Sequence, residues 1–98
     1  MKEFLQPLGD RVIFKNIDEE ITSGGIYLPD ISQERFLIGE AISVGAGLIT
    51  VQGVLIPTKV HVGDRFLYQK NSAFEFSFDS EKLSIIRETE IYAIILKR

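Results

Sequence analysis

Short runs of β-branched and aromatic residues, separated by glycine and polar residues, constrain this chain more than any other feature. The clearest is FEFSFD, residues 74–79, in which three phenylalanines alternate with glutamate, serine and aspartate. An alternation of period two places apolar side chains on one face of a strand. No span of helical length shows helical periodicity with caps, so we expect an all-β fold. The other expected strands are residues 11–15, 39–45, 59–64, 65–69, 82–87 and 91–96.

Glycines beside these runs predict sharp corners, because glycine supplies positive φ or a bulge where a strand must turn. They stand at positions 39, 45, 47, 53 and 63. Short strands with such corners favour a small barrel. The chain has 98 residues, which predicts a single domain over residues 1–98. A domain of this size buries only about 60–65% of its unfolded surface, so association with copies of itself would add stability.

Composition excludes several classes of function. The formal net charge is -3 and the basic residues are scattered, which argues against a nucleic-acid-binding surface. The chain has no cysteine and one histidine, so thiolate catalysis and Cys- or His-cluster metal sites are excluded. No nucleophile–base pair or phosphate-binding glycine loop is present, so we expect no enzymatic activity. No segment has the length of a signal peptide or membrane span, which predicts a cytoplasmic protein.

Residues 16–37 interrupt the strand pattern and are long for a loop in a compact domain. Within them, TSGGIYLPD (22–30) sets Ile26, Tyr27 and Leu28 between a Gly-Gly pair and a proline. This tripeptide could be a short edge strand packed on the barrel. It could equally be an apolar binding motif on a flexible tether. The residues alone leave both interpretations open.

Residues 48–58, LITVQGVLIPT, predict a hairpin that turns at Gln52 and Gly53. This hairpin lies within an uncharged run, residues 41–58, which is unusual for an exposed element. The alternating phenylalanines are expected to form core or a subunit interface, because their neighbours are too acidic for a base-stacking surface. Asp64 is expected to form a turn with the glycine before it, and His61 to lie on the surface.

Several motifs, in order along the chain, resemble those of the GroES co-chaperonins, the small ring-forming partners of the large chaperonins. PLGDRVIFK (7–15) resembles their N-terminal P-L-x-D-R-V-x-V-K signature, and GGIYL (24–28) their Gly-Gly-Ile-x-Leu loop. GEAISVGAG (39–47) and VHVGDRFLY (60–68) are similar to two further family motifs, and ETEIYAIIL (88–96) to the C-terminal one. The resemblance runs from end to end of the chain.

The resemblance implies a partly open, GroES-like β-barrel that assembles into a homo-heptamer, with residues 16–37 as a mobile loop. The heptamer would cap a large chaperonin ring of the 60 kDa class, which binds ATP and encloses unfolded client proteins, so no cofactor is expected in this chain. Docking is implied for Gly24, Gly25, Ile26, Tyr27 and Leu28. Contacts between neighbouring subunits are implied for the first and last strands, around Phe4, Leu5, Leu8, Ile91, Ile94 and Leu96.

The sequence also departs from the family pattern. Ile38 replaces a usual arginine at the root of the loop, and Tyr27 replaces a small or aliphatic residue. The roof hairpin, which commonly carries charged tip residues, is apolar, and we expect it to close the roof by packing around the symmetry axis. Its residues are Val51, Gln52, Gly53, Val54, Leu55 and Ile56. Two alternatives remain, a diverged paralogue with a different partner and a zinc-free relative of the alcohol dehydrogenase catalytic domain.

Overall fold

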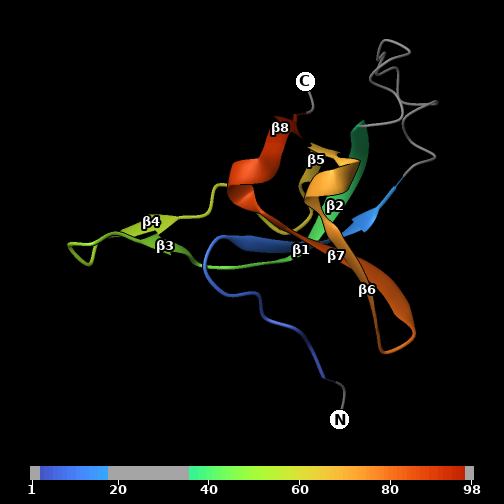
Figure 1. Ribbon diagram of the computed structural model, residues 1–98, viewed down its shortest axis with the longest axis horizontal. Helices are drawn as coiled ribbons and strands as arrows, with labels where there is room; N and C mark the ends of the chain where they lie inside the picture. The colour runs from blue at the N-terminus through green and yellow to red at the C-terminus, as the bar shows by residue number, and fades with distance from the viewer. Residues whose placement is uncertain (1–2, 18–35, 97–98) are drawn as a thin grey trace.

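The structure is a computed structural model that describes residues 3–17 and 36–96. This part of the chain forms eight strands and two short 3-10 helices (Figure 1). The strands are β1 (Arg11–Asn16), β2 (Phe36–Val44), β3 (Gly47–Ile49), β4 (Leu55–Pro57), β5 (Arg65–Gln69), β6 (Phe74–Phe78), β7 (Glu81–Arg87) and β8 (Ile91–Ile95). The 3-10 helices are η1 (Lys70–Ser72) and η2 (Glu88–Glu90). The all-β prediction is therefore confirmed.

Six of the strands form one antiparallel sheet in the order β6-β7-β1-β2-β5-β8. Strands β3 and β4 form a separate two-stranded sheet, which extends away from the larger sheet as an arm (Figure 1). Among the described residues, no pairing joins β6 to β8, so the larger sheet curls without closing. This matches the partly open barrel that the resemblance implied.

The core is built on three aromatic rings from β1 and β5. The ring of Phe14 lies 5.0 Å from that of Phe66 and 4.6 Å from that of Tyr68, both in edge-to-face geometry. Gly39 on β2 makes room for this cluster, because a Cβ at this position would lie 2.4 Å from Phe14 Cδ2. Other members of the buried cluster are Val12, Ala41, Val60 and Ile86. The core thus joins strands that are far apart in sequence.

One expected strand, residues 59–64, is not formed. Val60 is buried as the alternation predicts, but the next residues turn. The backbone N–H of Asp64 donates to the His61 carbonyl at 2.9 Å, and the Asp64 side chain accepts from the His61 N–H at 2.9 Å. Gly63 has a φ of +94°, which a strand does not use. The glycine–aspartate turn predicted from sequence is confirmed, and it takes the place of the strand.

The alternating phenylalanines form β6, as their pattern predicted, but none of the three side chains is fully buried. Phe74 is 77% exposed, while Phe76 and Phe78 are half-buried. The reason is the position of β6 at the edge of the sheet, where it pairs with β7 alone. The expectation that this stripe forms core is wrong, and the alternative of a subunit interface stays a prediction.

Candidate interaction surfaces

The expected docking motif, residues 24–28, lies outside the described residues, but the structure describes the residues on both sides of the segment that contains it. Asn16, the last residue of β1, pairs with Gly39 of β2. One residue further on, the Ile17 N–H donates to the Ile38 carbonyl at 2.9 Å. The two ends of residues 18–35 therefore leave the sheet from adjacent antiparallel strands. The segment between the two strands is shorter than the expected loop, residues 16–37. Strand β1 extends through Asn16, and β2 already begins at Phe36.

The root of this segment is firmly packed. Ile38 is 2% exposed, and the residue before it, Leu37, packs against the core. The ring of Phe36 meets that of Tyr92 at 4.9 Å in edge-to-face geometry. The Asn16 side-chain amide donates to the Tyr68 hydroxyl at 2.6 Å. The apolar root predicted from Ile38 therefore does pack its end onto the barrel.

The N-terminal segment exposes large apolar side chains. Phe4 is 85% exposed and Leu8 is 71% exposed, while Leu5 lies lower at 36%. The segment is held by side-chain contacts with the end of β2, in which Ser43 Oγ donates to the Leu5 carbonyl at 3.2 Å. It forms no strand in the described structure, contrary to the implied first strand. In the described structure the neighbouring strand β2 is already paired on both sides, with β1 and β5, so this segment cannot pair with it as a further strand.

Strand β8 is the opposite edge of the sheet from β6 and pairs with β5 alone. Its register places Leu67 opposite Ala93 and Tyr68 opposite Ile91, which leaves Tyr92 without an opposing residue. This β-bulge breaks the alternation of period two. Because of the bulge, Ile91 and Ile94 both pack against the subunit's own core rather than facing outward.

The bulge also changes which residues of the C-terminal strand are available for contact. Tyr92, which is not among the interface residues expected from the sequence, is 59% exposed. Leu96, just beyond the strand, is 80% exposed, as expected for an interface residue. The sequence pattern does not predict the bulge. An extra residue in a strand can be recognised only from its pairing with the neighbouring strand, here β5.

The β3–β4 arm presents the expected roof residues to solvent. Leu48 pairs with Ile56, and Ile49 with Leu55, in antiparallel register. Gln52 and Gly53 lie in the turn at the tip, where Gly53 has a φ of +87°. The exposed fractions are 103% for Val51, 59% for Val54, 49% for Leu55 and 51% for Ile56. Every apolar side chain of the predicted roof is therefore about half exposed or more in the single chain.

A buried carboxylate lies at the junction between this arm and the sheet. Asp10 is 3% exposed, and its Oδ1 accepts from Arg87 Nε at 3.3 Å. The carbonyl of Asp10 accepts from the Glu88 N–H at 2.8 Å, and that of Gly9 accepts from the Gly47 N–H at 2.9 Å. The P-L-G-D-R motif thus ties the root of the arm to the end of β7. This motif carries the family resemblance in the sequence, but its role at the arm is visible only in the structure.

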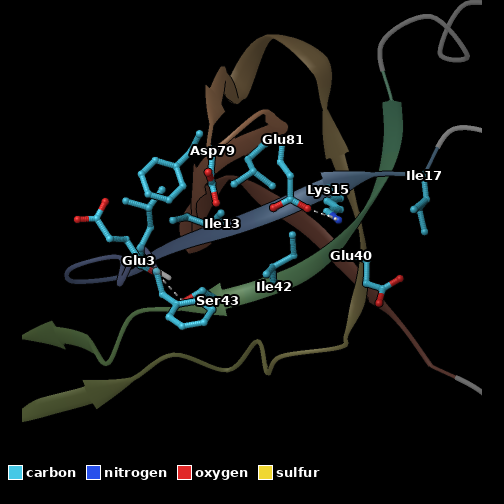
Figure 2. A pocket seen from close by; sticks show the side chains of 13 residues that line it. Glu3, Ile13, Lys15, Ile17, Glu40, Ile42, Ser43, Asp79 and Glu81 are labelled. Atoms are coloured by element: carbon cyan, nitrogen blue, oxygen red, sulfur yellow. Dashed lines mark hydrogen bonds and ion pairs between the residues drawn. The ribbon is translucent and has the colours of Figure 1, made fainter. Parts of the chain in front are cut away.

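A groove of about 560 Å³ runs between the N-terminal segment, β1, β2 and the turn that joins β6 to β7 (Figure 2). Ile13 and Ile42 contribute apolar surface to it, and Lys15 Nζ lies 3.2 Å from Glu81 Oε2. Glu3, Glu40 and Asp79 add further acidic groups. Among the residues the structure covers, no group of three or more potential ligands could hold a metal ion. In the same part of the chain, no helix has the length and apolar character needed to cross a bilayer.

Comparison with known proteins identifies the protein family to which this chain belongs. The family model described as "Chaperonin 10 Kd subunit" matches residues 4–95. The co-chaperonin GroES of Chlorobium luteolum is 45% identical over 92 residues, covering 93% of this chain and 97% of that protein. The co-chaperonin GroES 2 of Bradyrhizobium diazoefficiens is 45% identical over 91 residues, covering 92% of this chain and 88% of that protein. The chain belongs to the chaperonin 10 kDa subunit family.

Proposed function

We propose that this chain is a co-chaperonin subunit that forms a heptameric ring, and that this ring is the lid of a large chaperonin of the 60 kDa class. The observation that carries the proposal is the family match over residues 4–95, which includes all of the described strands. The lid would regulate the nucleotide-dependent enclosure and folding of client proteins. Its subunits would act in the cytoplasm and catalyse no reaction of their own.

Two exposed features of the subunit, the edge of β8 and the N-terminal segment, support assembly into a ring. The free edge of β8 offers backbone donors and acceptors, and the N-terminal segment offers an unpaired stretch that exposes Phe4 and Leu8. A segment of one copy can add as a strand to the edge of the next copy. The segment and the β8 edge are different parts of the subunit, so a contact between them is head-to-tail and can close into a ring.

The segment from 18 to 35 would dock the lid on the chaperonin through Gly24, Gly25, Ile26, Tyr27 and Leu28. Burial of each large apolar side chain is worth about 1.5–3 kcal/mol, whereas ordering each loop residue costs about 1–2 kcal/mol. One docked loop should therefore bind weakly. Linked loops on one ring bind at high effective concentration once the first has docked, which makes the cap strong but reversible.

Control of the lid would then lie with the partner. If the nucleotide state of the large chaperonin exposes or hides the docking groove, it changes the affinity at every site at once. A small change in the free energy of docking at each site adds up over all the subunits of the ring. In this proposal ATP binds to the partner, and this chain contributes no cofactor site.

The test is nucleotide-dependent binding of the ring to the large chaperonin from the same organism, followed by size-exclusion chromatography. A variant with Ile26→Ser and Leu28→Ser should lose co-elution, while the wild type co-elutes only with nucleotide. A matched control with Ile21→Ser and Ile31→Ser makes the same chemical change elsewhere in the same segment, and it should bind like the wild type. Equal loss in both variants would contradict the docking role of residues 24–28. A wild-type ring that never binds would instead favour a diverged paralogue with another partner.

A further inference from the structure

The groove beside the N-terminal segment has an apolar floor that the subunit covers only in part. Ile13 and Leu83 line it and are buried, whereas Ile42, which also lines it, is 38% exposed. The floor lies on the side of β1 that faces away from the core, because Ile13 alternates with the core residues Val12 and Phe14. The volume of about 560 Å³ lies in the range of roughly 300–1,000 Å³ that is typical of ligand sites. The groove is therefore separate from the core and large enough to hold a ligand.

A β-bulge turns Ile42 toward this groove. In the pairing of β1 with β2, Ile13 lies opposite Ser43, and Phe14 lies opposite Ala41. Ile42 therefore has no opposing residue. Consecutive strand residues normally face opposite ways, yet Ile42 and Ser43 both line the groove. Bulges are frequent next to functional sites, where they re-aim a side chain, and this bulge adds an apolar side chain to the groove.

The carboxylates around the groove make it acidic. Its lining contains Glu3, Glu40, Asp79 and Glu81 but only one basic residue, Lys15. Lys15 Nζ lies 3.2 Å from Glu81 Oε2, so these two charges already offset each other. Within residues 3–17 and 36–96, no ion pair engages the three other carboxylates. A partner that brings cationic groups would be complementary to them.

The acidic and apolar groups follow one another along the groove. Figure 2 shows Glu3 toward one end and Glu40 toward the other, with Ile42 between them. Glu40 and Ile42 are two residues apart on β2, which is about 7 Å along a strand. An extended peptide presents alternate side chains at the same spacing, because its rise per residue is the same. A peptide with a cationic, an apolar and a cationic side chain on one face therefore matches the groove in charge and in spacing.

The segment of this chain that adjoins the groove has the wrong charge to fill it. Residues 18–35 follow Ile17, which lines the groove, and contain five acidic residues and one basic residue. Like charges would oppose their entry. Lys97 and Arg98 are basic, but they follow β8, which is separated from β2 by β5 in the sheet. The basic tail of a second copy is therefore the rival occupant.

We propose that the groove binds an extended segment of another protein, in which an apolar side chain lies between two Lys or Arg residues on the same face. The apolar side chain packs against Ile42, and the cations lie beside Glu40 at one end and Glu3 at the other. Such a segment is accessible in an unfolded chain, since folding tends to bury its apolar residue. All of the lining residues belong to one subunit, so this site does not depend on the proposed ring.

The probe is the fluorescein-labelled peptide KSISK, in which the isoleucine and both lysines share one face of an extended chain. The control peptide ESISE reverses the charge, and the control KSSSK lacks the apolar side chain. Fluorescence anisotropy measures the affinity of each peptide for the full chain. KSISK should bind at least about tenfold more tightly than either control, because each control lacks one of the two kinds of contact. Added salt should weaken the binding of KSISK by screening.

The apolar contact is tested with Ile42→Ser. Its control is Ile49→Ser, which makes the same change on the β3–β4 arm, outside the groove lining. Ile42→Ser should weaken the binding of KSISK at least about fivefold, and Ile49→Ser should leave it within about twofold of the wild type. In the wild type, the methyl resonances of Ile42 should shift when KSISK is added, and those of Ile49 should not.

The charge contact is tested with Glu40→Gln combined with Asp79→Asn. Asp79 has a φ of +55°, a left-handed conformation that asparagine also adopts readily. The control, Glu75→Gln combined with Glu90→Gln, removes two exposed carboxylates that do not line the groove. The groove variant should weaken the binding of KSISK at least about fivefold, and the control should stay within about twofold of the wild type. These variants decide the test if circular dichroism shows that Ile42→Ser fails to fold.

Three outcomes would overturn the proposal. If KSISK binds no more tightly than ESISE and KSSSK, the groove does not recognise this chemistry. If the groove variants bind KSISK like their controls, the peptide binds elsewhere on the subunit. A variant with Lys97→Ser and Arg98→Ser tests the rival occupant, and we expect it to bind KSISK like the wild type. Binding at least about threefold tighter than the wild type would assign the groove to the tail of a second copy, because loss of a competing cationic segment frees the site.

Discussion

The β1 strand and the β3–β4 arm have similar apolar residues and opposite exposure. Val12 and Phe14 of β1 are 0% exposed, whereas Ile49 and Val51 of the arm are 70% and 103% exposed. Strand β1 lies between β2 and β7 in the larger sheet, so neighbours on both edges and the core face cover it. In the described part of the chain, each strand of the arm pairs only with the other. The difference teaches that an apolar run favours burial, while the tertiary structure decides whether the subunit itself buries that run.

The largest expected effect is that of Phe14→Ala on β1. This side chain is fully buried against Phe66 and Tyr68, so its loss should lower the free energy of unfolding by about 3–5 kcal/mol. The measurement is urea unfolding at a fixed protein concentration, because assembly into the proposed ring would contribute to apparent stability.

The matched control for that change is Leu55→Ala in the arm, where the side chain is half exposed. Below the dissociation concentration of the proposed ring, the free energy of unfolding of this variant should lie within about 0.5 kcal/mol of the wild-type value. An equal loss for Leu55 and Phe14 in the dissociated subunit would break the comparison, because the arm would then belong to the subunit's own core.

A smaller effect is expected from Gly47→Ala at the root of the arm. Gly47 has a φ of +127°, and an added Cβ would lie 2.0 Å from the Ile56 carbonyl oxygen. Strain and the clash together should cost about 2–4 kcal/mol and separate β3 from β4. The control is Gly53→Ala at the tip, where a Cβ added at this position would have no atom within 4 Å beyond its chain neighbours. Only the positive φ of Gly53 opposes this change, at a cost of about 1 kcal/mol. Hydrogen exchange of the arm amides measures the loss of β3–β4 pairing in each variant. Equal protection of these amides in the two variants would contradict the conclusion that Gly47 allows β3 and β4 to pair.

The smallest effect concerns the root of residues 18–35. Asn16→Ala removes the 2.6 Å hydrogen bond to the Tyr68 hydroxyl, which should cost about 0.5–1.5 kcal/mol. It should also speed hydrogen exchange of the Ile17 amide next to it. Tyr92→Phe, which removes an exposed 3.4 Å hydrogen bond to Gln69, is the control and should change stability by less than about 0.5 kcal/mol. No difference between the two variants would mean that Asn16 does not hold the root.

Much of the fold follows from local pattern, and its failures have identifiable causes. The alternation of FEFSFD predicted β6, but nothing in those residues indicates that β6 is an edge strand with Phe74 exposed. Residues 59–64 have strand composition, yet Gly63 and the side chain of Asp64 stabilise a turn there. The bulge at Tyr92 turned Ile91 and Ile94 inward, which a strict alternation could not predict.

The local pattern of residues was enough for the strand type, the turns and the neutral character of the arm, because these depend on side chains close together in the chain. Burial was decided by tertiary structure. Val12 is covered because its strand lies between Val44 on one side and Ile86 on the other, two residues that are distant from it in sequence. Within residues 3–17 and 36–96 the arm meets no such strand, so its equally apolar residues stay exposed there. Burial of a side chain depends on neighbours that only the fold brings together, whereas strand and turn preferences act within a few residues.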